Sequence, residues 1–240
     1  MNNVAIVTGA GKRVGRELAT GLLASGWTVV AHVRRTEDDV PAGAIKVPAD
    51  LAVAGCAEII LGACPAAPRL LVNNAARFAH DDLAQPSADE LQRHMAVNVA
   101  APAMLIKAFA DAGTGGDRLI VNILDAKLAA PNPDYLSYTL SKAALSALTG
   151  IAAQALAERG VRVNAVSPAL MLLSNGQTEA NFRAAHAFNP LQRGVEPADI
   201  LRAVQFFLDS PALTGEVLTL DGGQRFWRLH RDVQYLDLKK

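Results

Sequence analysis

Short apolar runs rich in Val, Ile and Leu alternate along the chain with longer Ala- and Leu-rich segments of helical period. The runs are apolar at nearly every position, which is typical of strands buried on both faces of a parallel sheet. We therefore expect strands at Val4–Val7, Thr28–Val33, Leu70–Val72, Leu119–Ile123, Val161–Val166 and Glu216–Leu220. With helices between them, this order predicts an α/β fold, a single-domain Rossmann-type doubly wound parallel sheet with helices on both faces.

Two glycines support the expected helix boundaries. Gly26 and Gly160 come directly after helical patterns at Arg16–Ser25 and Ser141–Arg159. A residue that accepts a positive φ commonly ends a helix at such a position. Ligands of doubly wound sheets bind at the carboxyl ends of the strands, so the residues that follow each strand are the candidates for a site.

Composition limits the classes of function. A chain of 240 residues, 51% apolar and 19% charged, can form one large core, so we expect one domain over residues 1–240, with residues 224–240 as a tail beyond the sheet. Lys plus Arg and Asp plus Glu each number 23, and no overall field favours nucleic acid or anionic lipid. The apolar stretches are interrupted before the ~18 residues that a membrane span requires, so we expect no membrane association and a small-molecule ligand.

The cysteines and the first residues of the chain indicate the cellular location to expect. Cys56 and Cys64 are too few for a disulfide framework and lie far from any His cluster, so we expect no metal site. Val4–Val7 leads straight into a glycine turn, without a basic region followed by an apolar run and a cleavage site. These features predict a cytoplasmic location.

A glycine-rich turn follows the first expected strand and opens the first helix. Missing side chains let backbone N–H groups approach a pyrophosphate, and the amino end of the helix adds a favourable partial charge. A tight turn without a ligand is the alternative, but the strand, the helix and the later motifs favour a dinucleotide. The candidate cofactor-binding residues in this turn are Thr8, Gly9, Lys12, Arg13, Val14 and Gly15.

The end of the second strand indicates which dinucleotide binds. The segment His32-Val33-Arg34-Arg35-Thr36 lacks the acidic residue that would bind a free ribose 2′-hydroxyl. Guanidinium groups match the geometry of a 2′-phosphate, so NADP(H) is favoured over NAD(H), with His32, Arg34, Arg35 and Thr36 as candidates. The alternative is that Arg34 and Arg35 simply form a solvent-exposed surface of the loop. Arg13 could add a charge to the same phosphate or reach the substrate.

Residues after two further strands complete the expected cofactor site. Asp50 and Leu51 follow what would be the third strand and could hold the adenine, although an ordinary helix cap explains Asp50 almost as well. Asn74 and Ala75 follow the next strand, where small residues would let a ribose lie against the backbone.

A tyrosine and a lysine at helical spacing carry the candidate chemistry. Tyr138 and Lys142 share one face of a helix, and a neighbouring ammonium should lower the phenol pKa from its usual value of about 10. Lys142 could also bind the cofactor through a hydrogen bond to the nicotinamide ribose. Asp125 lies thirteen positions before Tyr138. Asn98, in a helix that begins near Asp89, could support Lys142 through a water or a backbone carbonyl.

Together these motifs resemble the short-chain dehydrogenase/reductase family over Val4 to about Gly223. The resemblance rests on the glycine turn, Asn73-Asn74-Ala75, Asn98, Tyr138 with Lys142, Ser167-Pro168 and Asp221-Gly222-Gly223. It implies that Pro168 contacts the cofactor and that the protein forms a homotetramer through the helices at Ala88–Ala110 and Tyr138–Arg159.

Within that family the chain is most similar to the pteridine and dihydromonapterin reductases. Those members share an Arg in place of a loop glycine, here Arg13, and a similar phosphate site, here His32 to Thr36. They also carry an Asp in place of the catalytic Ser, here Asp125. The resemblance implies that Phe78 stacks a pterin against the nicotinamide. Ala76, Arg77 and Ala169 depart from the pattern and leave the substrate open.

The predicted function is transfer of a hydride from NADPH to a C=N bond of a pterin-like substrate. An ionised aspartate only accepts hydrogen bonds and a protonated one can donate a proton, so Asp125 favours ring N–H or amino groups. Tyr138 would relay the proton, Arg13 and Phe78 would orient the ring, and the segment Leu170–Pro190 would cover the site. The alternatives are a carbonyl or sugar reductase of the same family and a non-catalytic NADPH-binding sensor or scaffold.

Overall fold

The computed structural model describes residues 3–113, 116–173 and 177–237. Its centre is a seven-stranded sheet in the order β3-β2-β1-β4-β5-β6-β7, and neighbouring strands are parallel throughout. The strands are β1 (Val4–Val7), β2 (Thr28–Val33), β3 (Ile45–Pro48), β4 (Leu70–Asn73), β5 (Arg118–Ile123), β6 (Val161–Pro168) and β7 (Val217–Leu220). The predicted doubly wound sheet is confirmed.

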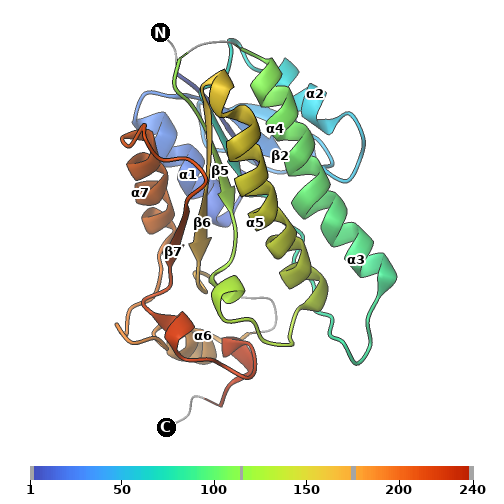
Figure 1. Ribbon diagram of the computed structural model, residues 1–240, viewed down its shortest axis with the longest axis vertical. Coiled ribbons are helices and arrows are strands. Elements are labelled where there is room, and N and C mark those ends of the chain that lie inside the picture. The colour runs from blue at the N-terminus through green and yellow to red at the C-terminus, as the bar shows by residue number, and fades with distance from the viewer. Residues whose placement is uncertain (1–2, 114–115, 174–176, 238–240) are drawn as a thin grey trace.

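Helices cover both faces of this sheet (Figure 1). The helices are α1 (Arg13–Ala24), α2 (Cys56–Gly62), α3 (Ala88–Met95), α4 (Ala101–Asp111), α5 (Leu136–Leu156), α6 (Glu179–His186) and α7 (Pro197–Leu208). One face carries α1 and α7, and the other carries α2, α4 and α5. The expected continuous helix over Ala88–Ala110 is divided by a π-helical segment at Ala96–Ala100, which contains Asn98.

The continuous apolar runs are explained by alternation between two cores. Ala5 and Val7 of β1 face α1 and α7, whereas Val4 and Ile6 face α2, α4 and α5. The inner strands β1, β4 and β5 are buried at every position, so both sets of positions are mostly apolar. The edge strands β3 and β7 keep exposed positions. Full burial of a Leu or Phe such as Phe207 stabilises the fold by about 1.5–3 kcal/mol.

The helical stretch Leu136–Arg159 is long and apolar enough to cross a membrane by length and composition alone, contrary to the expectation that no stretch of this length occurs. A core helix passes the same test. Buried side chains of α5, Leu145 and Thr149 among them, pack towards the sheet. Only 33% of the apolar window is buried, however, and Leu140 and Ile151 remain exposed.

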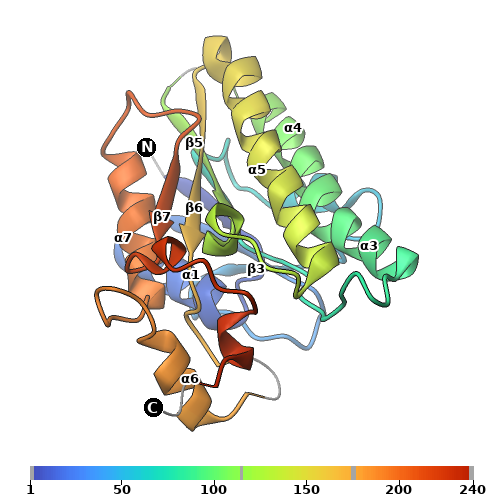
Figure 2. The same cartoon turned by 60° about the horizontal axis from the view of Figure 1, so that its bottom comes forward.

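The sheet order reverses between β1 and β4, and the carboxyl ends of both strands reach the same edge. A crevice at such a switch point is where open α/β sheets bind ligands. Figures 1 and 2 show that α6 and the residues after β7 lie at this end of the molecule. The tail therefore packs on its own chain, beside the start of α5. Parts of the expected lid and tail, residues 174–176 and 238–240, lie outside the described residues.

Candidate active site

The glycine turn after β1 is built for close backbone approach. Gly9 has φ +68°, in the left-handed region that favours glycine. A Cβ on Gly15 would overlap the carbonyl oxygen of Gly9, so the first turn of α1 can lie against the loop only without a side chain there. Lys12 is exposed at the N-cap of α1, whereas Val14 points into the core.

Residues after β4 hold this turn in place. The buried hydroxyl of Thr8 accepts hydrogen bonds from the backbone N–H groups of Asn74 and Ala75, both at 3.0 Å. The side-chain amide of Asn74 donates to the carbonyl of Thr8 at 2.9 Å. The Asn74 side chain therefore fixes the loop from β1 to α1 rather than projecting into open space.

His32 has a different role from the one expected. Its Nδ1 accepts a hydrogen bond from Gly9 N at 3.1 Å, and its Nε2 lies 2.9 Å from the carbonyl oxygen of Ala49. The ring is 2% exposed, and burial lowers its pKa. Both nitrogens are occupied, so His32 holds the glycine turn against β3 and is not placed to bind a phosphate.

The arginines after β2 are open to solvent beside the glycine turn. Arg34, Arg35 and Thr36 are all exposed. The guanidinium of Arg35 lies 3.7 Å from the Glu37 carboxylate, and its backbone N–H donates to Asp38. Within the described parts of the chain, the side chain of Arg34 has no such partner. Arg34 is therefore the better placed of the two to meet an anionic group.

Three further expected cofactor residues have local structural roles. Asp50 is exposed and accepts a hydrogen bond from Ala52 N at 2.9 Å within a turn. It is not a helix cap, because α2 begins at Cys56 with Gly55 as its N-cap. Leu51 is buried in the core beside α2. Pro168 is buried at the end of β6, paired with Leu220 of β7.

Arg13 occupies a left-handed position, with φ 54°, where a glycine would be the usual residue. Its exposed guanidinium donates a hydrogen bond to the carbonyl of Leu172 at 3.4 Å. The side chain therefore reaches from the glycine turn to the segment after β6, towards the substrate side rather than towards Arg34.

Asp125 and Tyr138 meet at the end of β5. The Tyr138 hydroxyl donates to Asp125 Oδ2 at 3.0 Å, and Asp125 Oδ1 accepts from Lys127 N at 2.9 Å. Asp125 is partly accessible from a cavity and otherwise surrounded by protein, and this desolvation raises its carboxyl pKa. The two groups can therefore share a proton.

Lys142 does not act on Tyr138 as the sequence suggested. Its Nζ donates to the carbonyl of Ile123 at 2.6 Å and lies 5.7 Å from the centre of the Tyr138 ring. Burial lowers the pKa of Lys142 to about 8. The pKa of Tyr138 is raised well above its usual value, by burial and then by the charge of Asp125. The expectation that Lys142 lowers it is wrong for this arrangement, because these two effects are larger.

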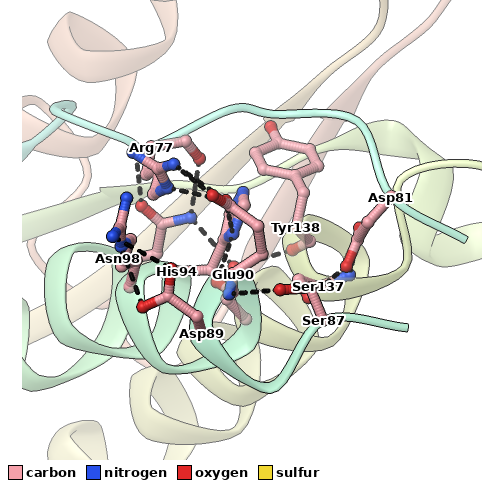
Figure 3. A network of polar contacts seen from close by, with 11 residues as sticks. Arg77, Asp81, Ser87, Asp89, Glu90, His94, Asn98, Ser137 and Tyr138 are labelled. Carbon is pink, nitrogen blue, oxygen red and sulfur yellow. Dashed lines mark hydrogen bonds and ion pairs between the residues drawn. The ribbon is translucent and has the colours of Figure 1, made fainter. Parts of the chain in front are cut away.

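Asn98 links the loop after β4 to α5 (Figure 3). Its side chain accepts from Arg77 N at 2.7 Å and donates to Arg77 O and to Ser141 Oγ. Ser141 Oγ in turn donates to the carbonyl of Tyr138. Asn98 thus contacts the helix that carries Tyr138 through Ser141, not through Lys142 as expected. A π-helical segment at such a residue is common in functional sites.

Arg77 is turned away from the cavity. Its guanidinium forms an ion pair with Glu90 of α3, with contacts of 2.7 to 3.0 Å (Figure 3). The pairing lowers the pKa of Glu90. Arg77, which departs from the family pattern, therefore fixes the loop before Phe78 to α3.

Asp81 is a site residue that the sequence did not reveal. The N-cap of α5, Tyr135, provides no side-chain cap. Instead the carboxylate of Asp81 accepts from Ser137 N at 2.9 Å and from Ser137 Oγ at 2.5 Å (Figure 3). Ser137 directly precedes Tyr138, so Asp81 fixes the start of the helix that presents the phenol. No local pattern marks an acid 56 positions away as a cap.

A cavity of about 100 Å³ adjoins the Asp125–Tyr138 pair. Phe78 lies at its wall, half exposed, stacked on Tyr135 at a centroid distance of 4.4 Å and edge-on to Tyr138 at 4.8 Å. The structure thus brings together three of the four expected substrate residues, while Arg13 is not in the lining. The tail contributes residues that the sequence did not single out: Gln224, Arg225, Trp227, Leu229, Asp232, Val233 and Gln234.

Comparison with known proteins assigns the class. A family model described as Enoyl-(Acyl carrier protein) reductase matches residues 9–225. The chain belongs to the short-chain dehydrogenase/reductase family.

Individual relatives narrow the resemblance. Pteridine reductase 1 of Leishmania tarentolae is 32% identical and aligns over 94% of this chain and 97% of its own length. L-xylulose reductase of Homo sapiens is 31% identical over 92% of this chain and 95% of that protein. Among solved structures, FolM alternative dihydrofolate reductase 1 from Brucella suis, in complex with NADP, is 34% identical with a TM-score of 0.87 and covers 94% of this chain and 95% of that one.

Proposed function

We propose that this chain uses NADPH to reduce a C=N bond of a dihydropterin. The contact that carries the proposal joins the Tyr138 hydroxyl to the Asp125 carboxyl, 3.0 Å apart, at the wall of a cavity beside Phe78. A carboxyl group whose pKa is raised can hold a proton as well as accept a hydrogen bond. It can therefore pair with the ring N–H and amino groups of a nitrogen heterocycle.

The chain is an oxidoreductase of its family, and its cofactor is NADP(H). The glycine turn fits a pyrophosphate, because Gly9 takes a left-handed φ and Gly15 lets the amino end of α1 lie directly against the loop. Arg34 and Arg35 supply cations beside that turn, and no carboxylate ends β2. NADPH supplies the hydride when it is bound.

The chain's own residues supply the proton. Tyr138 stays a neutral phenol near pH 7, because its pKa is raised, and it gives its proton to the nitrogen of the reduced C=N bond. The phenolate so formed is reprotonated from Asp125, which exchanges protons with the cavity. Lys142 is held by the carbonyl of Ile123, with its Nζ 5.7 Å from the centre of the Tyr138 ring.

A carbonyl or sugar reductase is the second candidate. L-xylulose reductase and D-erythrulose reductase sequences align over most of the chain at 31% identity, and that similarity favours it. Against it, Asp125 stands where a ketone oxygen would need a hydrogen-bond donor. A carboxylate offers that donor only in its protonated form.

The deciding experiment follows the loss of NADPH with dihydropterins, dihydrofolate and a panel of ketones and sugars, with NADH as the control cofactor. We expect turnover of dihydropterins with NADPH and little with ketones. Tyr138→Phe should abolish turnover and leave NADPH binding nearly intact. Ketone reduction without dihydropterin reduction would select the second candidate. Retained activity in the Tyr138→Phe variant would contradict the proton-transfer role.

We also propose that the protein assembles as a homotetramer. The outer surfaces of α4 and α5 leave large apolar side chains exposed, including Met104, Leu140 and Ile151 at 53%, 48% and 64%. Burial of such side chains between copies would stabilise an assembly. Light scattering coupled to gel filtration tests this, and a monomer at micromolar concentration would contradict it.

A further inference from the structure

The tail after β7 lies at the same end of the molecule as α6 (Figure 2). Its residues supply part of the lining of the cavity beside Asp125 and Tyr138. Arg231 forms an ion pair with the nearly buried carboxylate of Asp134 at 2.9 Å. The hydroxyl of Tyr235 lies 2.9 Å from that of Tyr135. These contacts attach the tail to the loop between β5 and α5, the same loop that begins with Asp125.

A partly buried ion pair lies where the tail meets this loop. Lys127 Nζ is 3.5 Å from Asp232 Oδ2, with the two side chains 9% and 23% exposed. The ammonium also donates to the carbonyl of Asp134. Both Lys127 and Asp232 line the cavity. Lys127 is two residues after Asp125 and donates its backbone N–H to that carboxyl, so the pair adjoins the reacting group.

The charges around the cavity are unfavourable for an anionic substituent. Among the described lining residues the cations are Lys127 and Arg225, and each is already paired, Arg225 with Asp221 at 2.5 Å. Asp125 accepts hydrogen bonds from Tyr138 and Lys127 and provides no cation for a carboxylate. A carboxylate that entered would have to displace Asp232 or Asp221 from a partner. A hydroxyl group meets no such cost, because it can accept from the Lys127 ammonium and donate to the Asp232 carboxylate.

We propose that Lys127 and Asp232 form a subsite for an uncharged, hydroxylated substituent of the substrate ring. The inference rests on the proposed function, since it assumes a ring held at Asp125, Tyr138 and Phe78. It adds a preference between dihydropterins with different substituents, which the proposed function does not specify. A polyhydroxylated dihydropterin is preferred over one whose substituent ends in carboxylates.

The test compares kcat/KM for three substrates with NADPH. Dihydromonapterin carries a hydroxylated chain, 6,7-dimethyl-7,8-dihydropterin carries no hydroxyl group, and dihydrofolate carries carboxylates. We expect the wild-type protein to favour dihydromonapterin over both others. In Lys127→Met, the ratio of kcat/KM for dihydromonapterin to that for the dimethyl compound should fall about tenfold, equivalent to about 1.4 kcal/mol. Lys127→Arg should restore part of it.

Asp232→Asn provides an independent measurement. This change leaves the Lys127 charge without its carboxylate partner, so the ratio of kcat/KM for dihydrofolate to that for dihydromonapterin should rise at least fivefold. Lys107→Met is the matched control, because Lys107 forms an exposed ion pair with Asp111 on α4, away from the cavity. That control should change neither ratio.

The outcomes separate the subsite from the proposed function. If the wild-type protein reduces the dimethyl compound but Lys127→Met and Asp232→Asn leave both ratios unchanged, the subsite is wrong and the proposed function stands. A wild-type preference for dihydrofolate also overturns the subsite. If none of the three dihydropterins is reduced, the proposed function fails and the subsite falls with it.

Discussion

Removal of the Asp81 carboxylate should both destabilise the protein and slow its reaction. Asp81 side-chain oxygens accept from the backbone N–H and the hydroxyl of Ser137, and Asp81 is 7% exposed. Its backbone carbonyl also accepts from Leu136 N, a bond that Asp81→Ala keeps. The substitution therefore removes only the side-chain cap from the first turn of α5.

The expected magnitude follows from these two bonds. A hydrogen bond to a charged acceptor contributes about 1.5–3 kcal/mol, and loss of an N-cap costs about 1–2 kcal/mol. The bonds share one acceptor group, so we expect a combined loss of about 2–3 kcal/mol. For a domain of this size, that lowers Tm by about 5–10 °C. Ser137→Ala removes only one of the bonds and should cost about half as much.

The catalytic effect distinguishes capping from general destabilisation. Tyr138 follows Ser137, so a loosened first turn displaces the phenol, and kcat should fall by about 10- to 100-fold at a temperature where the variant is folded. Ser87→Ala is the control, because Ser87 caps α3 through Glu90 N and the change should cost about 1 kcal/mol without altering kcat. If Asp81→Ala lowered Tm but kept kcat within twofold, Asp81 would not position Tyr138.

Three further predictions follow from the cofactor end and from Lys142. Because burial lowers the folded-state pKa of Lys142 to about 8, the native protein binds fewer protons than the unfolded chain above that pH, and its stability rises towards pH 10.5. The difference in unfolding free energy between Lys142→Met and the wild type should therefore shift by about 3 kcal/mol in favour of the wild type between about pH 8 and 10.5. A difference that stays constant at all pH values in denaturation experiments would contradict this. Gly15→Ala should weaken NADPH binding more than tenfold, as measured by calorimetry. Gly150→Ala is the control: a Cβ there meets nothing within 4 Å, so this change should raise the free energy of unfolding by about 0.5–1 kcal/mol. Arg34→Ala should raise the NADPH dissociation constant by about tenfold and leave that for NADH unchanged, with a smaller effect for Arg35→Ala; equal effects on both cofactors would exclude a 2′-phosphate contact.

The sequence predicted what short-range patterns determine. The inner strands were visible in the sequence because both of their faces are covered, and the glycine turn was visible because it lies between a strand and a helix. Asp125, Tyr138 and Phe78 were expected together, and they line one cavity. Asp125 and Tyr138 lie at the ends of adjacent elements, and the family resemblance added Phe78 to them.

Other features depend on partners that are distant in the sequence. His32 was expected at a phosphate, but Gly9 and Ala49 occupy its ring nitrogens. The pKa of Tyr138 was expected to fall beside Lys142, yet it rises because the phenol is buried against Asp125. The burial of a side chain and the charges near it depend on residues from several elements of the fold. The spacing of residues along one helix therefore does not predict them.

The carboxyl group at position 125 should lower stability in exchange for substrate recognition. Desolvation raises its folded-state pKa, so the folded protein binds more protons than the unfolded chain, and stability falls as pH rises above about 4. Asp125→Ser keeps an oxygen that can accept from Lys127 N but removes the charge. We expect this variant to be more stable than the wild type at pH 7 by about 1–3 kcal/mol, the usual cost of a poorly solvated polar group.

The pH dependence identifies the cause of that difference. The gain in unfolding free energy for Asp125→Ser should disappear below about pH 3, where the wild-type carboxyl is protonated in both states. Turnover of dihydropterins should fall in the same variant, because the group that pairs with ring nitrogens is gone. A variant that was less stable than the wild type at pH 7 would mean that the bonds to Tyr138 and Lys127 outweigh desolvation, and that Asp125 is an ionised structural group rather than a proton carrier.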